Sequence, residues 1–294
     1  MRWRKAALIG VGLLGGSLGL ALKRRKLADR IEGFVRRPES VQECEKFKVV
    51  HKAGLDLSEI VTGADLIVFC TPLSQMKELA EKMRAAVSPG ATVTDVGSVK
   101  STIVNDLEPI FARANAHFVG SHPMAGAERT GPSAASEDLF EQAICIITPI
   151  PDSNGAAVEN VAQLWKSVGG IPRIMSPEIH DQLVGRSSHL PHVLAAELVN
   201  FVLGSKNFEA QASVCANGFR DSTRIASSSP EMWRDICLAN RENLVKALTG
   251  FAGELERFRH ALEGNDVKTI EAFFKNAKQK RDEWQSRKSS RSPE

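Results

Sequence analysis

The 294-residue sequence contains no tyrosine, and its five cysteines are scattered without a CxxC pair. This cysteine pattern favours neither a disulfide-stabilised secreted domain nor a zinc site. No apolar run is long enough to cross a bilayer. Charge of one sign is also lacking, because 38 basic residues nearly balance 35 acidic ones, for a net charge of +3. We therefore expect a cytoplasmic protein without a metal, a membrane anchor or a nucleic-acid partner.

The first 176 residues alternate short apolar runs, rich in β-branched residues, with helical patterns. Alternation of this kind predicts an α/β domain of the Rossmann type, in which helices cover a doubly wound parallel sheet. The predicted strands are residues 6–9, 31–35, 66–70, 92–96, 117–119 and 144–148, with 171–175 as a last edge strand.

From residue 177 onward the pattern becomes long helical periodicity, as in HVLAAELVNFVL and ENLVKALTGFAGELERF. We predict an all-helical domain over residues 177–284, followed by a disordered basic tail at 285–294. One short domain can hardly bury so many apolar runs by itself. The helical domain is therefore expected to form an isologous homodimer.

The N-terminal stretch MRWRKAALIGVGLLGGSLGLAL admits two interpretations. A charged start before an apolar run is typical of a secretory signal. However, Gly10, Gly12 and Gly15 have the spacing GxGxxG directly after an apolar strand, and a helical pattern follows. This context favours a dinucleotide-binding turn that includes Leu13 and Leu14, with a purely structural glycine turn as the alternative.

The residues after the second strand bear on the choice of cofactor. The fingerprint expects an acidic residue there to bind the ribose 2′-hydroxyl. The sequence GFVRRPES has Val35 at this position, followed by Arg36 and Arg37. Arginine suits a 2′-phosphate, so NADP is favoured over NAD; a solvated loop with two charges is the alternative.

Polar residues follow the later strands, at the sheet edge where α/β folds bind ligands. Thr71 and Pro72 follow the third strand, and Asp95 and Ser98 close the fourth; all four are candidate cofactor contacts. The fifth strand leads into GSHPMAG. We predict that its histidine, His122, is a general base whose tautomer is fixed by a hydrogen bond to Ser98.

Five motifs together resemble the prephenate and arogenate dehydrogenases of tyrosine biosynthesis. They are GVGLLGGSLGLAL, DVGSVKS, GSHPMAGAERTG, SHLPH and GFRDSTRIASSSPEMWRDI, in this order. The resemblance implies a Rossmann-type domain, a helical dimerisation domain, and NAD(P)-dependent oxidative decarboxylation of a cyclohexadienol. It also implies that His122 is catalytic and that Ser98 supports it.

The same resemblance implies which residues contact the substrate. Arg224 matches the arginine that binds a substrate carboxylate. The other matched positions are Asp221, Trp233, His180, His189 and His192. Which of His189 and His192 faces the substrate is left open.

Several alternatives remain at this point. Prephenate is the expected substrate, and arogenate, or both, is the alternative; Glu128 could pair with the arogenate ammonium group. A β-hydroxyacid-type dehydrogenase would instead use a lysine, for which Lys100 is the candidate. A non-enzymatic NADP sensor is the third possibility. No fused mutase or regulatory module is expected after Trp284.

Overall fold

The computed structural model describes residues 2–127 and 129–289. Contacts divide the chain into two compact units, Met1–Arg241 and Glu242–Glu294. This division lies beyond the predicted boundary at 176/177. The reason is that helix α7 (Pro177–Val184) packs on α5 and β8, and helix α11 (Pro230–Ala239) packs on α4, so both stay with the first unit.

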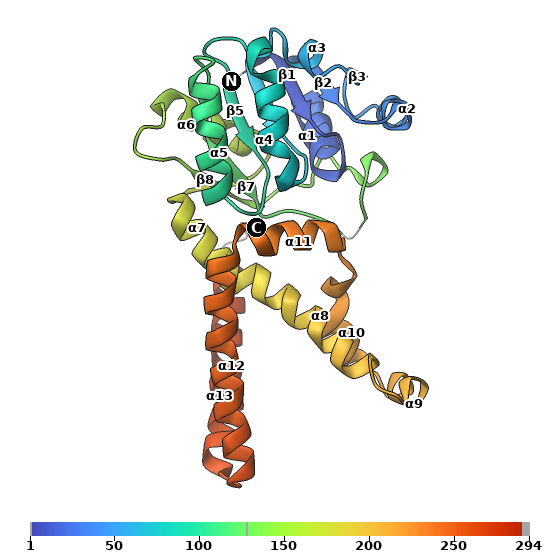
Figure 1. The fold of residues 1–294 in the computed structure, drawn as a ribbon, viewed down its shortest axis with the longest axis vertical. Helices are drawn as coiled ribbons and strands as arrows, with labels where there is room; N and C mark the ends of the chain where they lie inside the picture. Colours follow the sequence, from blue (N-terminus) through green and yellow to red (C-terminus); the bar gives the residue numbers. More distant parts are fainter. Residues whose placement is uncertain (1, 128, 290–294) are drawn as a thin grey trace. The chain divides into compact units, whose positions relative to one another are not determined.

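The first unit is built on a six-stranded, entirely parallel sheet with the strand order β3-β2-β1-β4-β5-β6 (Figure 1). This architecture confirms the predicted Rossmann-type fold. The strands are β1 (Trp3–Ile9), β2 (Ala28–Phe34), β3 (Lys52–Gly54), β4 (Leu66–Phe69), β5 (Thr92–Asp95) and β6 (His117–Phe118). The helices between them are α1 (Leu13–Arg24), α2 (Pro38–Lys46), α3 (Leu57–Val61), α4 (Leu73–Met83), η1 (Arg84–Ala86) and α5 (Ser101–Ala112).

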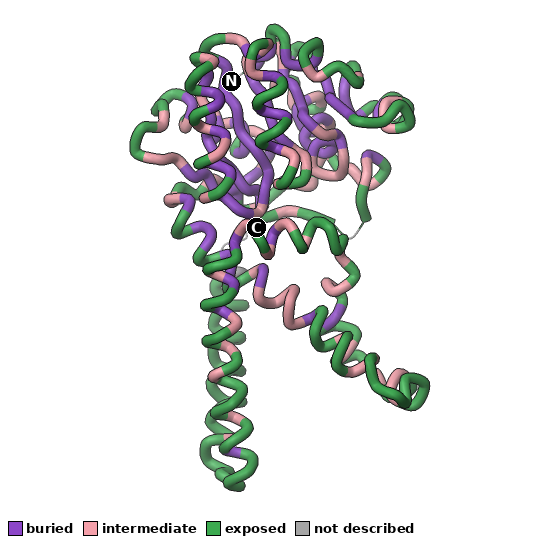
Figure 2. The backbone as a smooth tube through the Cα atoms, in the orientation of Figure 1, coloured by how far each residue is buried: buried purple, intermediate pink, exposed green. Residues whose placement is uncertain are grey.

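Two apolar cores cover the two faces of this sheet, and Figure 2 shows the burial concentrated in its strands. Along β1, Ala6 and Leu8 belong to one core, whereas Ala7 and Ile9 belong to the other. Successive residues of a strand point to opposite faces, so a strand covered on both faces is apolar throughout. The N-terminal apolar stretch is thus part of the folded core, in β1 and α1.

A second sheet of three strands corrects the prediction for residues 144–148 and 171–175, which do not extend the parallel sheet. It contains β7 (Gly120–Pro123), β8 (Ile144–Thr148) and β9 (Ile171–Ile174). Strand β7 is antiparallel to β8, and β8 is parallel to β9. The chain passes from β7 to β8 through a loop that includes the short 3-10 helix η2 (Pro132–Ala134). Between β8 and β9, helix α6 (Gly155–Ser167) supplies the crossover that a parallel pair needs.

The rest of the first unit is helical. Helix α7 continues through a π-helical turn, Gly185–His189, into α8 (Leu190–Leu203). Pro191 is the second residue of α8, directly after the π-helical turn, and because proline has no N–H the backbone hydrogen-bond ladder is interrupted at this point. The elements that follow are α9 (Phe208–Ser213), α10 (Asn217–Thr223), η4 (Arg224–Ser227) and α11.

The second unit consists of helices α12 (Arg241–Glu263) and α13 (Val267–Ser289). An aromatic cluster joins them, with the ring centroids of Phe258 and Phe273 at 4.5 Å. The disordered tail predicted from residue 285 is corrected up to Ser289, because α13 extends to that residue. The remainder of that tail, 290–294, lies outside the described residues.

Candidate active site

The glycine-rich turn between β1 and α1 has the geometry of a dinucleotide cradle. Gly10 has φ +98°, a conformation that favours glycine. A Cβ on Gly15 would lie 2.1 Å from the Gly10 carbonyl oxygen, so α1 can approach β1 only without a side chain there. A Cβ on Gly12 would meet nothing within 4 Å. The space beside Gly12 is therefore open for a ligand, as the fingerprint requires.

The residues after β4 support the same assignment. Thr71 lies beside the turn, since a Cβ on Gly10 would touch its Cγ2 at 2.9 Å. The buried Thr71 hydroxyl has no hydrogen-bond partner among the described residues. Buried polar groups normally have a partner, so this hydroxyl fits a group that a cofactor would provide. Pro72 follows as the N-cap residue of α4.

The end of β2 carries the two arginines considered for cofactor selection. Val35 is buried, whereas Arg36 and Arg37 are both exposed. Arg37 is the N-cap residue of α2. Neither guanidinium has an ion-pair partner within the part of the chain that the structure describes. Both are free to meet an anion at the carboxyl edge of the sheet.

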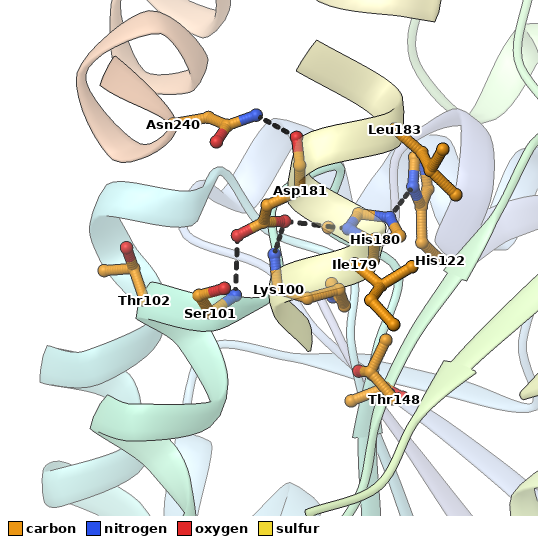
Figure 3. A network of polar contacts seen from close by, with 12 residues as sticks. Lys100, Ser101, Thr102, His122, Thr148, Ile179, His180, Asp181, Leu183 and Asn240 are labelled. Carbon is orange, nitrogen blue, oxygen red and sulfur yellow. Dashed lines mark hydrogen bonds and ion pairs between the residues drawn. The ribbon is translucent and has the colours of Figure 1, made fainter. Parts of the chain in front are cut away.

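His122 lies on β7 and is buried, with 9% of its surface exposed. Its Nδ1 is 2.8 Å from Nε2 of His180, which comes from α7 (Figure 3). The predicted partner for this ring was Ser98, so the residue that fixes the His122 tautomer was assigned wrongly. The reason is tertiary: α7 packs against β8 and brings His180 to the ring from outside the parallel sheet.

His180 corrects a second expectation, that it contacts the substrate. The residue is fully buried and both ring nitrogens are engaged within the protein. Its Nδ1 is 2.7 Å from Oδ1 of Asp181. The two oxygens of Asp181 in turn accept hydrogen bonds from the backbone N–H groups of Lys100 and Ser101, at 2.7 and 2.8 Å. His180 therefore stands behind His122 rather than beside a substrate.

Beneath this group lies an ion pair between Lys100 and Asp95, and both side chains have no exposed surface. The Lys100 ammonium also donates to the Ser121 carbonyl oxygen at 2.8 Å. Asp95 accepts hydrogen bonds from the backbone N–H groups of Gly97 and Ser121, at 2.8 and 3.0 Å. The predicted cofactor contact at Asp95 is thus replaced by a structural role. Lys100 is likewise inaccessible, which weighs against a lysine acid–base mechanism.

The electrostatic surroundings keep the His122 imidazole neutral. Burial, followed by the neighbouring His180, Lys100 and His189, lowers the pKa of His122 well below its usual range. The neutral ring can therefore accept a proton near neutral pH. A buried histidine at the carboxyl edge of the parallel sheet has the state that a general base requires.

The two histidines of the SHLPH motif occupy different environments. His189 is fully buried, and its Nδ1 accepts a hydrogen bond from the Asn240 amide at 3.1 Å. Burial is the main cause that lowers the pKa of His189 to about 4. His192 is half-buried and stacks on Trp233, with ring centroids at 3.9 Å. Its Nδ1–H donates to the Ser188 carbonyl oxygen, which leaves Nε2 as an acceptor.

Of the other predicted site residues, Arg224 lies beside His192, whereas Asp221 is at the surface. Arg224 begins η4, and its charge contributes to lowering the pKa of His192, so the two side chains are neighbours. Asp221 is exposed and pairs with Arg220 at 3.2 Å. Ser98 is half-buried in the loop after β5. Glu128, considered as a partner for an ammonium group, lies outside the described residues.

Two residues of the site were not identified from the sequence, Asp181 and Asn240. Asn240 is buried and donates from its side chain to the Asp181 carbonyl oxygen at 2.8 Å. The only sequence signal for Asp181 is its position directly after His180, and adjacent residues of a helix do not normally face each other. Here the two side chains nevertheless meet, with Nδ1 of His180 2.7 Å from Oδ1 of Asp181.

Among the described residues, no cluster of three or more histidine, cysteine or acidic side chains is arranged to hold a metal ion. No helix in the described ranges has the length and apolar character needed to cross a membrane.

The sheet order, the glycine turn and the buried histidine together define a Rossmann-type dehydrogenase. Comparison with known families agrees with this class. Residues 18–173 match the family model described as "Prephenate dehydrogenase, nucleotide-binding domain", and residues 176–276 match "Prephenate dehydrogenase, dimerization domain". The chain therefore belongs to the prephenate dehydrogenase family, and it is an oxidoreductase.

Individual relatives span nearly the whole chain. It is 36% identical to a prephenate dehydrogenase of Bacillus subtilis, covering 94% of this chain and 74% of that protein. It is 32% identical to a cyclohexadienyl dehydrogenase of Zymomonas mobilis, covering 95% of each chain. The crystal structure of Aquifex aeolicus prephenate dehydrogenase with hydroxyphenyl propionate and NAD⁺ superposes with a TM-score of 0.90 at 33% identity, covering 96% of this chain and 99% of the other.

Proposed function

We propose that this protein catalyses the oxidative decarboxylation of prephenate to 4-hydroxyphenylpyruvate, with NADP as the preferred cofactor. The observation that carries the proposal is the buried, neutral imidazole of His122 at the sheet edge where the glycine turn would hold a dinucleotide. Bound NADP⁺ would accept the hydride that leaves C4 of the ring. The protein's own residues then have two tasks, which are to remove a proton and to hold two carboxylates.

Proton removal is the proposed task of His122. Its Nδ1 is occupied by His180, so Nε2 is the nitrogen available to the 4-hydroxyl group of the substrate. As hydride leaves C4, this nitrogen takes the hydroxyl proton and a carbonyl forms at C4. The C1–carboxylate bond then breaks, carbon dioxide leaves, and its electron pair makes the ring aromatic. The oxygen on C4 takes a proton back from His122, which gives the phenol of the product. Ser98 is proposed to assist from the loop after β5.

Substrate binding is assigned to the helical elements of the first unit. The Arg224 guanidinium would form charge-assisted hydrogen bonds with a carboxylate. His192, half-exposed and stacked on Trp233, is the residue of the SHLPH motif that we place against the substrate, whereas His189 is enclosed and bonded to Asn240.

The NADP preference rests on the end of β2. Arg36 and Arg37 are exposed there, and buried Val35 stands where an acid would bind the ribose hydroxyl. Charge-assisted hydrogen bonds are worth about 1.5–3 kcal/mol each, so replacing both arginines by glutamine should reduce kcat/KM for NADP by roughly tenfold or more. The same change should leave kcat/KM for NAD nearly unaltered. Equal efficiency with both cofactors in the parent protein would refute the preference.

Arogenate is the second candidate substrate, because the Zymomonas mobilis relative is a cyclohexadienyl dehydrogenase that aligns over 95% of each chain. The decisive experiment measures NADPH and NADH formation with prephenate and with arogenate. Turnover of prephenate with the higher kcat/KM supports the proposal. Exclusive turnover of arogenate would change the substrate, and nucleotide binding without turnover of either would indicate a sensor.

Variants test the residue roles within this assay. His122→Asn should lower kcat by about 10² to 10⁴, the usual range for a positioned base, while cofactor affinity is retained. Arg224→Ala should mainly raise KM, because a carboxylate contact acts in the ground state and the transition state alike. If His122→Asn turns over within a factor of a few of the parent, His122 is a structural residue and the mechanism is wrong.

Assembly through the helical elements is proposed as an isologous homodimer. Large apolar side chains are exposed on them, among them Phe201 at 80%, Phe274 at 60% and Trp284 at 55%. The matched family model over residues 176–276 describes a dimerization domain. Light scattering at micromolar concentration should give twice the mass of one chain, and a monomer mass would refute the dimer.

A further inference from the structure

Three buried side chains form a continuous hydrogen-bonded line at the candidate active site (Figure 3). Oδ1 of Asp181 contacts Nδ1 of His180 at 2.7 Å, and Nε2 of His180 contacts Nδ1 of His122 at 2.8 Å. The three residues are 2%, 0% and 9% exposed. The line ends at His122, whose Nε2 is the proposed base.

The charge of Asp181 determines where the protons lie along this line. Burial alone would raise the pKa of Asp181, but hydrogen bonds from His180, Lys100 and Ser101 outweigh it and lower that pKa. Asp181 is therefore an ionised acceptor, and Nδ1 of His180 must carry a hydrogen. In a neutral His180, Nε2 is then an acceptor, so Nδ1 of His122 must donate. Each step leaves the next ring one tautomer, and His122 is left with its lone pair on Nε2.

We propose that His180 and Asp181 are positioning residues that make His122 an effective base, as a relay of two histidines and one carboxylate. This inference rests on the proposed function, since it assigns a reason why His122 can take the substrate proton. When His122 becomes an imidazolium, its Nδ1–H bond to His180 strengthens, and the buried carboxylate two groups away compensates the new charge.

The surroundings explain why compensation is needed. Besides His180, His122 faces Lys100 from the start of α5 and His189 from the π-helical turn, and both disfavour a positive charge on its ring. Asp95 on β5 is already paired with Lys100. Asp181 is thus the carboxylate left to stabilise a protonated His122. Its place is fixed by the first backbone N–H groups of α5, where a helix N-terminus favours negative charge.

Two variants interrupt the relay at different points. His180→Gln can still accept from Nδ1 of His122 through its amide oxygen, but it cannot connect that ring to Asp181. Asp181→Asn removes the charge. Both should lower kcat at the pH optimum by roughly tenfold to a hundredfold, the size expected for losing one charge-assisted hydrogen bond. Both should also move the acidic limb of the kcat profile to lower pH, because His122 becomes a weaker base, and both should change KM little.

A matched control separates this effect from simple loosening of α7. Ser176 is the N-cap residue of that helix, and its hydroxyl accepts from the Ile179 N–H at 3.3 Å. Its carbonyl oxygen accepts from the backbone N–H of His180 at 3.0 Å, a bond that alanine retains, so the substitution removes only a side chain that has no contact with the three relay side chains. Ser176→Ala should lower the melting temperature but leave the acidic limb in place. If both relay variants keep kcat within a factor of three of the parent with an unmoved limb, His180 and Asp181 are scaffold only and the inference is overturned.

A measurement on the unmodified protein covers variants that fail to fold. Nitrogen-15 NMR of histidine-labelled protein near neutral pH distinguishes the two ring tautomers. The relay requires hydrogen on Nδ1 of both His122 and His180, and hydrogen on Nε2 of His180 would overturn it. Failure of the proposed function looks different, because parent protein inactive on both substrates, or active His122→Asn, refutes the base itself whatever the tautomers are.

Discussion

Replacement of Lys100 by methionine tests both the stability of the site and its mechanism. The side chains of Lys100 and Asp95 have no exposed surface, so the substitution leaves a carboxylate buried without its cation. Breaking a buried pair by removing one partner costs about 3–5 kcal/mol. Asp95 keeps the N–H groups of Gly97 and Ser121, so we expect the lower end, about 3 kcal/mol.

The loss can be measured by thermal unfolding. For a domain of this size it corresponds to a drop in melting temperature of roughly 5–10 °C. The double variant Asp95→Asn/Lys100→Met should recover much of that loss, since neither buried charge remains. A single variant that melts within about 1 °C of the parent would show that the pair contributes little and would refute this reasoning.

Lys100→Met should also shift the pH dependence of activity in a defined direction. The Lys100 charge is one of the causes that lower the pKa of His122, after burial and His180. Removing it should raise that pKa, so activity should be lost at a higher pH on acidification than in the parent. Abolished turnover at every pH, with a folded protein, would instead favour a lysine acid–base mechanism of the β-hydroxyacid kind.

Two further predictions concern the glycine turn and acid stability. Gly15→Ala should lower the melting temperature, because its Cβ would lie 2.1 Å from the Gly10 carbonyl oxygen. Gly12→Ala, whose Cβ would meet nothing within 4 Å, should keep the melting temperature but weaken NADPH binding in a fluorescence titration. If the two variants have the same melting temperature and the same NADPH affinity, this assignment is wrong. Folding lowers the pKa of His189 from 6.5 to about 4. Between these two pH values the unfolded state binds more protons than the folded state. The free energy of unfolding should therefore fall by about 3 kcal/mol as the pH is lowered from 6.5 to 4. Thermal melts at pH 7 and pH 5 cover the upper part of this window and should show about 2 kcal/mol of the loss, which His189→Gln should reduce. An equal loss in both proteins would show that other groups cause it.

Much of this protein could be predicted from local sequence pattern. The strand-turn-helix around Gly10, Gly12 and Gly15 is specified within some 20 residues, because glycine spacing, apolar strands and helical periodicity are all short-range signals. The parallel sheet and the helical elements after residue 177 follow in the same way. His122 was found because it follows a predicted strand end, where this fold class binds ligands.

The tertiary structure alone decided the partners of those residues. A sequence pattern predicts where a strand ends but not which helix packs against that end. For this reason the sequence predicts Ser98 as the partner of His122, whereas the structure has His180 there. The relay joins β7 to α7 across 58 residues of sequence, and the Asp181 carboxylate holds the start of α5 some 80 residues away. Residues 144–148 give a second example. The alternation of strands and helices along the chain predicts that they belong to the parallel sheet. They pair antiparallel with β7, and the described residues between the two strands contain no helix of the length that a parallel crossover needs. Long-range packing determined these contacts, and no local pattern encodes it.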